Sequence, residues 1–116
     1  MEERMMIATD AKRVAQKHYD LLQQDDLAKW AETLTMEHRI ALTIKGSSSR
    51  AWWDLGRGYF EQYGVHYKFN RVDQKKEDYC TLLFTKYGAD GSVHGVPVPI
   101  HMKKEDDKWK VEQASY

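Results

Sequence analysis

Histidine is the residue type in this 116-residue chain that most readily does chemistry, because its unperturbed pKa of about 6.5 allows proton transfer near neutral pH. One of the five histidines, His18, lies on the apolar stripe of a helix-like stretch, where it is either a catalytic group or a hydrogen-bonded core residue. The histidines have no close spacing such as His-x-x-x-His, so we expect no metal site: His18, His38, His66, His94 and His101.

Other reactive templates are missing from the sequence. It has no glycine-rich phosphate loop and no Gly-x-Ser-x-Gly elbow, so we expect neither a nucleotide nor any other cofactor. Paired carboxylates occur only in exposed-looking turns, at Asp25-Asp26 and Asp106-Asp107. Cys80 is the only cysteine, so no internal disulfide can form and a reducing compartment fits. In its strand-like run, Cys80 is best interpreted as a small buried hydrophobe.

Length and charge limit the classes of partner. The 18 basic and 18 acidic residues cancel, so no overall field attracts nucleic acid or an anionic membrane. Hydrophobic residues make up 41% of the chain, which suits a single globular domain over residues 1–116. Residues 1–8 lack the apolar core of a signal peptide, and we expect a flexible N-terminus there. No stretch reaches transmembrane length, so we expect a cytoplasmic protein.

Hydrophobic periodicity predicts three helices before the middle of the chain. Residues 9–24 and 26–34 repeat apolar side chains at three-and-four spacing. Residues 49–63 form an aromatic block, with Ser49 as its expected N-cap. Gly56 and Gly58 lie inside it, each costing roughly 1 kcal/mol relative to alanine, which favours a break near Gly58. Gly64 is well placed as a left-handed C-terminal cap.

Alternating patterns predict the strands. Residues 38–45 alternate through Ile40, Leu42 and Ile44 and predict a strand between the helices. After Gly64, strands are expected at 65–69, 79–87, 96–102 and from Trp109, with turns at Asp90-Gly91 and Asp106-Asp107. The run 79–87 has apolar residues on both faces, which requires cover on both sides of the sheet. Helices followed by a meander indicate an α+β fold, in which three N-terminal helices pack on a curved, mostly antiparallel sheet to form a cone.

This order resembles the nuclear transport factor 2-like superfamily, the cystatin-like cone that also houses ketosteroid isomerases and polyketide cyclases. The segments that carry the resemblance are 16–30, the helix 52–63 and the ending Lys108-Trp109-Lys110-Val111. The resemblance implies an apolar cavity inside the cone and frequent dimerisation through the sheet. Fold alone does not fix function in such a superfamily.

The resemblance also implies positions for isomerase chemistry, and this chain departs from them. The tyrosine position of the first helix holds His18, the base position holds Leu42 and the late-strand acid position holds His101. Because the base is missing, the isomerase mechanism should not be transferred. A pair formed by His18 and His101 remains a candidate acid and base. Strand parity opposes it, since Val96, Val98, Ile100 and Met102 form the apolar face and leave His101 on the other.

Aromatic residues are the stronger sign of a pocket, although rings at helical spacing often belong to an ordinary core. Trp52 and Trp53 are about 100° apart on a helix, so only one of them can face inward. The residues expected to line the pocket are Tyr19, Trp53, Tyr59, Phe60 and Tyr63.

We therefore expect a module that binds a small apolar or aromatic molecule and forms a homodimer, with no nucleic-acid or membrane partner. One alternative is an isomerase, dehydratase or cyclase that uses His18 and His101. Another is a dimeric adaptor that docks a protein through Trp52 or Trp53.

Overall fold

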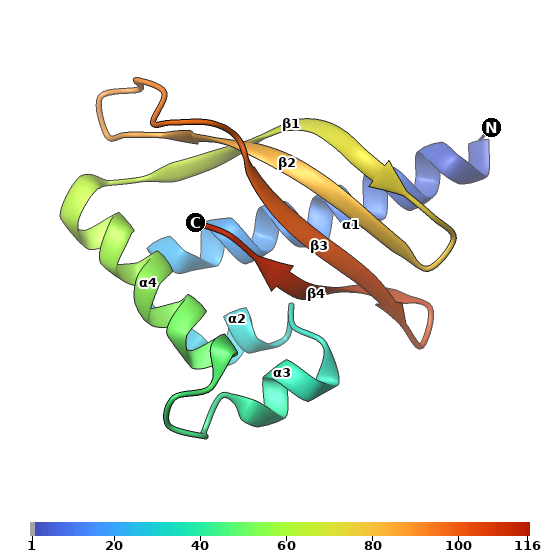
Figure 1. The fold of residues 1–116 in the computed structure, drawn as a ribbon, viewed down its shortest axis with the longest axis horizontal. Helices are drawn as coiled ribbons and strands as arrows, with labels where there is room; N and C mark the ends of the chain where they lie inside the picture. The colour runs from blue at the N-terminus through green and yellow to red at the C-terminus, as the bar shows by residue number, and fades with distance from the viewer. Residues whose placement is uncertain (1) are drawn as a thin grey trace.

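Helices come first in the chain and strands follow, as the computed structural model shows (Figure 1). It describes the backbone of residues 2–116 and side chains from residue 9 onward. The backbone of residues 2–8, where a flexible N-terminus was expected, lies in the first helix. The helical elements are α1 Glu2–Asp20, the 3-10 turn η1 Leu21–Gln23, α2 Leu27–Ala31, α3 Met36–Ala41 and α4 Ser48–Tyr63. The strands are β1 His66–Lys75, β2 Tyr79–Tyr87, β3 Val98–Glu105 and β4 Lys108–Ala114.

The strands form one antiparallel sheet in the order β1-β2-β3-β4, which confirms the predicted meander. Asp106 and Asp107 both have positive φ, 49° and 62°, as a two-residue hairpin turn requires. Register shifts interrupt β1 after Phe69 and again after Val72. Such irregularities bend a strand, and the sheet accordingly curves around the helical layer.

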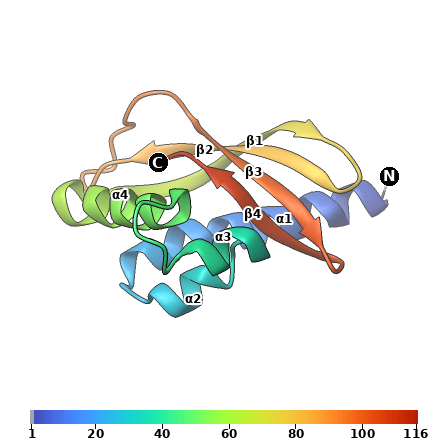
Figure 2. The same ribbon diagram turned by 60° about the horizontal axis from the view of Figure 1, so that its bottom comes forward.

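All helices lie on one face of the sheet and leave the other face without helical cover (Figure 2). α1 runs beneath the sheet and packs mainly against β1 and β4. The inner face is fully buried at the side chains of Leu82, Phe84, Ile100, Met102 and Val111. The α+β class and the curved antiparallel sheet expected from the sequence are thus confirmed.

The strand expected at residues 38–45 is wrong, because α3 occupies this region and raises the helix count to four. Ile40 and Ile44 are 64% and 59% exposed, and only Leu42 of the three alternating residues is buried. The preceding segment takes the free edge of β4 instead. Thr35 N donates to Val111 O, and Val111 N donates to Thr33 O. Residues 33–35 therefore occupy the edge of β4, and residues 38–45 do not extend the sheet there.

α4 runs from Ser48 to Tyr63 without the break expected near Gly58. Ser47 rather than Ser49 is the N-cap and accepts from Arg50 N, while Ser49 is buried and donates to the carbonyl of His38. Gly64 ends the helix at φ 63°, as predicted. Val96, expected in the third strand after Gly64, is 80% exposed and lies before β3.

The backbone of α4 packs mainly against η1 and α3, and α4 reaches the sheet largely through side chains. Gly56 allows the close approach to η1, since a Cβ there would lie 2.8 Å from the methyl groups of Leu22. Arg57 ties the same two elements by donating to Leu22 O and pairing with Asp25. α4 is therefore positioned by its helical neighbours and, at its C-terminal end, by the loop after β2, where Ala89 N donates to Tyr63 O.

Candidate ligand site

His18 lies at the base of the cone, fully buried and hydrogen-bonded through both ring nitrogens. Its Nδ1 is 2.8 Å from Thr33 Oγ1, and its Nε2 is 2.6 Å from the hydroxyl of Tyr116. Thr33 Oγ1 donates its only proton to Trp30 O at 2.7 Å, so it must accept from His18 Nδ1. The tautomer follows: Nδ1 carries the proton, and Nε2 accepts from Tyr116.

Burial lowers the pKa of His18 from 6.5 to about 3, so the imidazole is neutral at pH 7. Burial likewise raises the pKa of the Tyr116 hydroxyl well above its usual value, which keeps it a donor. Each polar hydrogen in the run from Tyr116 through His18 to Thr33 is therefore donated, and both ring nitrogens of His18 are engaged. This arrangement matches a hydrogen-bonded core histidine.

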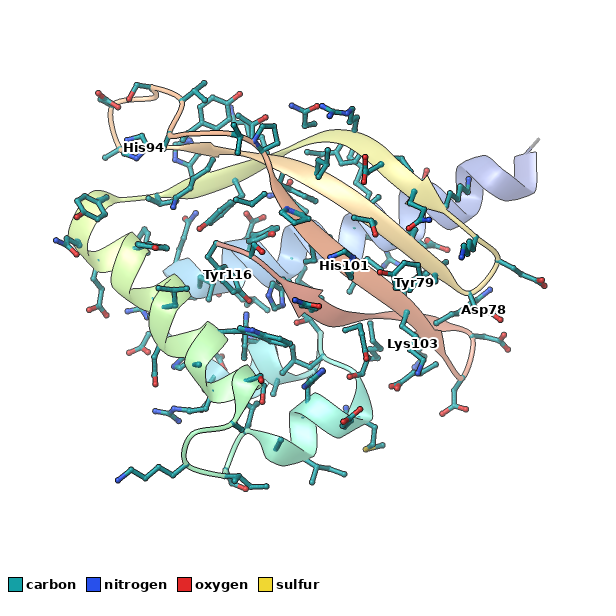
Figure 3. The ribbon with its side chains drawn as sticks, viewed as in Figure 1. Asp78, Tyr79, His94, His101, Lys103 and Tyr116 are labelled. Carbon is teal, nitrogen blue, oxygen red and sulfur yellow. The ribbon has the colours of Figure 1, made fainter. Side chains whose placement is uncertain are left out.

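The structure does not bring His18 and His101 together. His101 is paired across the sheet with Thr81, whereas the adjacent pair Ile100 and Leu82 is fully buried on the inner face. His101 therefore lies on the outer face, where its Nδ1 is 2.7 Å from the Tyr79 hydroxyl and 2.9 Å from Thr81 Oγ1 (Figure 3). Strand parity therefore predicted the face of the sheet on which His101 lies, whereas alignment with the isomerases did not. The acid–base pair of His18 and His101 expected from that alignment is not formed.

The aromatic residues expected to line a pocket differ in how deeply they are buried. Tyr19 and Trp53 are buried within the core, and Tyr59 and Phe60 are half-buried on α4. Tyr63 is 50% exposed. Of the adjacent tryptophans, Trp53 faces inward, and the half-buried Trp52 packs on the ring of His38.

Aromatic rings inside the cone contact one another in a continuous series. Trp30 contacts Trp53 and His18, and His18 stacks on Tyr116 at a centroid distance of 5.8 Å. Tyr19 meets the edge of Tyr116 at 5.8 Å and stacks on Tyr67 at 4.2 Å. Figure 3 shows Tyr116 between α4 and the sheet, where it closes the series.

Polar groups in this interior are incompletely paired. Three buried side-chain atoms have no hydrogen-bond partner within the described part of the chain: Trp30 Nε1, Thr35 Oγ1 and the Tyr67 hydroxyl. The hydroxyl of Tyr19, in contrast, donates to Ser115 O at 2.9 Å. An unpaired buried donor costs about 1–3 kcal/mol and calls for an explanation.

Lys86 reaches from the sheet to α4 beside Tyr67. Lys86 and Tyr67 are direct partners across β1 and β2, and the Nζ atom of Lys86 lies 3.9 Å from the centroid of the Tyr59 ring. Burial lowers the pKa of Lys86. The pKa of Tyr67 is raised mainly by burial and, to a smaller extent, by the neighbouring Tyr59. Tyr59, Tyr67 and Lys86 define what we call the open end of the cone.

Three residues of this region were not predicted from the sequence, namely Tyr67, Lys86 and Tyr116. A detectable signal existed for Tyr67, which alternates with Val65 and Phe69 on the inner face. Lys86 shares the inner-face parity of Leu82 and Phe84, but a lysine at a strand end is usually solvated. Nothing in the sequence indicated that Tyr116 would meet His18.

Hollows at the surface are more polar than the cone interior. One of about 400 Å³ lies between α1 and β4 and is lined by Arg13, Lys17, Glu32 and Lys110 among others. Another, of about 450 Å³, is lined by Gln16, Phe60, His66 and Tyr67 among others. Among the described side chains, those of residues 9–116, no cluster of three or more His, Cys, Asp or Glu is placed to hold a metal ion. Over residues 2–116, no helix combines the length and apolar character needed to cross a bilayer.

Comparison with known proteins finds similarity at the level of structure. No family model and no curated protein matches the sequence. A SEC-C motif-containing protein from Rhodopseudomonas palustris superposes with a TM-score of 0.62 at 14% identity, covering 88% of this chain and 74% of the other. A protein of unknown function with a cystatin-like fold from Nostoc punctiforme gives 0.63 at 12% identity, covering 92% and 86%. At these identities the likeness shows the fold alone, and that fold is cystatin-like.

Proposed function

We propose that this protein is a binding module for a small aromatic molecule held inside the cone, between α4 and the inner face of the sheet. The observation that carries the proposal is the pair of buried, unpartnered donors, Trp30 Nε1 and the Tyr67 hydroxyl. Indole Nε1 is only a donor, and a neutral phenol donates readily. A ligand with an acceptor oxygen would remove the cost of leaving either group unpaired.

The surroundings of these donors favour a ligand with a ring. Tyr67 stacks on Tyr19, and Trp30 packs against Trp53, so each donor is set among aromatic faces. Aromatic walls with a few polar atoms are typical of small-molecule sites, because they combine apolar contact area with orientation. A flat ring carrying a carbonyl or carboxyl oxygen has the matching shape and chemistry.

The proposed way in lies beside α4, where a surface hollow of about 450 Å³ is lined by Phe60 and Tyr67. The closest backbone neighbours of α4 are η1 and α3, and its last residue, Tyr63, accepts a hydrogen bond from Ala89 N. We expect side chains of α4 such as Tyr59, which is half-buried, to rotate when a ligand enters. Binding is favoured over acid–base catalysis, because His18 is neutral with both nitrogens engaged and His101 lies on the opposite face of the sheet.

Titration with acetophenone, which has a ring and one acceptor oxygen, tests the proposal. Ethylbenzene serves as the probe of similar shape without the oxygen. Nitrogen–proton NMR spectra of the intact protein should show acetophenone shifting the indole signal of Trp30 and amides of β1 and α4. Ethylbenzene should bind at least fivefold more weakly.

Tyr67→Phe, which removes the unpartnered hydroxyl, should weaken acetophenone binding severalfold if the carbonyl lies at this end of the ring series. Tyr87→Phe is the matched control, since Tyr87 lies on the outer face of the sheet, where it stacks on His66, and it should leave binding unchanged. Absence of binding by both probes at millimolar concentration, or shifts confined to the surface, would overturn the proposed function.

A further inference from the structure

We infer that the ligand is an aromatic carboxylate, whose acidic group pairs with Lys86 and accepts a hydrogen bond from Tyr67 at the open end of the cone. This inference rests on the proposed function and adds the charge of the ligand and the residue that selects it.

Lys86 is a half-buried cation without a counter-charge. No described Asp or Glu side chain forms an ion pair with it, and its Nζ atom contacts only the face of Tyr59, 3.9 Å from the centroid. Lys110 offers an instructive contrast, because it is also half-buried but donates to the carbonyl of Glu32 at 2.7 Å. A cation–π contact leaves the ammonium donors of Lys86 free for an anion.

Tyr67 supplies the second contact to the same group. Direct partners on an antiparallel pair have Cβ atoms about 4.5–5.5 Å apart, so the side chains of Tyr67 and Lys86 can reach one small ligand group together. The Tyr67 hydroxyl is buried and unpartnered, and its raised pKa keeps it protonated as a donor. An ammonium beside a neutral hydroxyl donor is complementary to a carboxylate.

The rest of the open end specifies the body of the ligand. Tyr59 lies against Lys86, and Tyr67 stacks on Tyr19, so the carboxylate site is bordered by aromatic rings. A cation would be repelled by Lys86, and a purely polar anion would gain nothing from this aromatic border. A short arylalkanoic or benzoic acid satisfies both parts of the site.

Calorimetric titration with phenylacetate and its neutral counterpart phenylacetamide tests the inference. Phenylacetate should bind the intact protein at least tenfold more tightly than phenylacetamide. Lys86→Met, which keeps the aliphatic stem over Tyr59, should abolish this preference. Lys86→Gln provides a second variant, and thermal unfolding verifies that both are folded.

Lys68→Met is the matched control. Lys68 also lies over a tyrosine ring, 5.5 Å from the centroid of Tyr87, but it is exposed and does not belong to the open end. This variant should retain the preference for phenylacetate. Loss of the preference in Lys68→Met would place the anion on the surface and overturn the inference.

The remaining outcomes separate the inference from the proposed function. Equal binding of phenylacetate and phenylacetamide, unchanged in Lys86→Met, overturns the charge inference and leaves the binding module standing. Acetate binding as tightly as phenylacetate overturns the aromatic part. If no aromatic probe binds, acetophenone included, the proposed function fails and the inference fails with it.

Discussion

His18 joins three parts of the chain through one ring. It lies on α1, hydrogen-bonds Thr33 after α2, and accepts from Tyr116, beyond the end of β4. Because the ring is fully buried, a charge there would be desolvated and would also break the acceptor role of Nε2. Its neutral form is thus part of the folded structure.

This burial predicts a pH dependence of stability. The unfolded chain binds a proton to His18 near pH 6.5, but the folded protein does so only at a pKa of about 3. The contribution of neutral His18 to the free energy of unfolding is therefore complete above pH 6.5. It is lost as the pH falls toward 3, at about 1.4 kcal/mol per pH unit. The free energy of unfolding can be measured with urea at pH 7.0 and pH 4.5. Between these values it should fall by about 2 kcal/mol less in His18→Gln than in the wild type.

His94→Gln is the control for this measurement, because His94 is exposed, and it should follow the wild-type pH dependence. The glutamine amide can still accept from Tyr116 and donate to Thr33, which keeps the variant folded. A wild type and a His18→Gln variant with the same pH slope would contradict a buried, neutral His18.

At the scale of elements, the two glycines inside α4 have different roles despite being two residues apart. The Cβ of a residue replacing Gly56 would lie 2.8 Å from the buried Leu22 side chain, whereas nothing lies within 4 Å of such a Cβ at Gly58. Gly56 therefore permits helix packing, and Gly58 only lowers helix propensity.

Replacing each glycine by alanine should give opposite signs. Gly58→Ala should raise the free energy of unfolding by up to about 1 kcal/mol through helix propensity. Gly56→Ala should lower it by about 1–3 kcal/mol, since Leu22 must shift in a packed core. Denaturant unfolding of both variants measures the difference, and equal stabilisation by the two substitutions would show that α4 does not pack closely on η1.

At the scale of the whole molecule, the sheet has one face covered by helices and one face without such cover (Figure 2). The uncovered face is not uniformly polar. Thr81 is buried there, Leu83 and Pro99 are half-buried direct partners on β2 and β3, and Tyr79 is half-buried at the start of β2. Exposed apolar area on a sheet face favours association with a second copy, since helices supply cover on only one side.

We accordingly expect a homodimer that forms through this outer face. Leu83→Glu should place a charge at its centre and produce a monomer, measured by light scattering after size-exclusion chromatography. Val96→Glu is the control, because Val96 is 80% exposed in the loop before β3 and should leave the dimer intact. A wild-type protein that is monomeric at 100 µM would refute the expectation.

Local patterns determined much of this molecule from the sequence alone. Periods of 3.6 and 2 residues placed α1, α2, α4 and the four strands, because each element buries one face. Gly64 and the Asp106-Asp107 turn were predictable, since left-handed backbone is tolerated by few residue types. The parity of β3 placed His101 on the outer face, because side chains of a strand alternate strictly.

Only the tertiary structure decided the rest. Residues 38–45 alternate like a strand, but Thr33 and Thr35 hydrogen-bond the edge of β4, and helix α3 follows them along the chain. The contact between His18 and Tyr116 spans nearly the whole chain, and that between Tyr67 and Lys86 depends on strand register. Sequence patterns report which face a residue presents, whereas the partner on that face is set by how separate elements pack. The ring series and the open end of the cone are products of that packing.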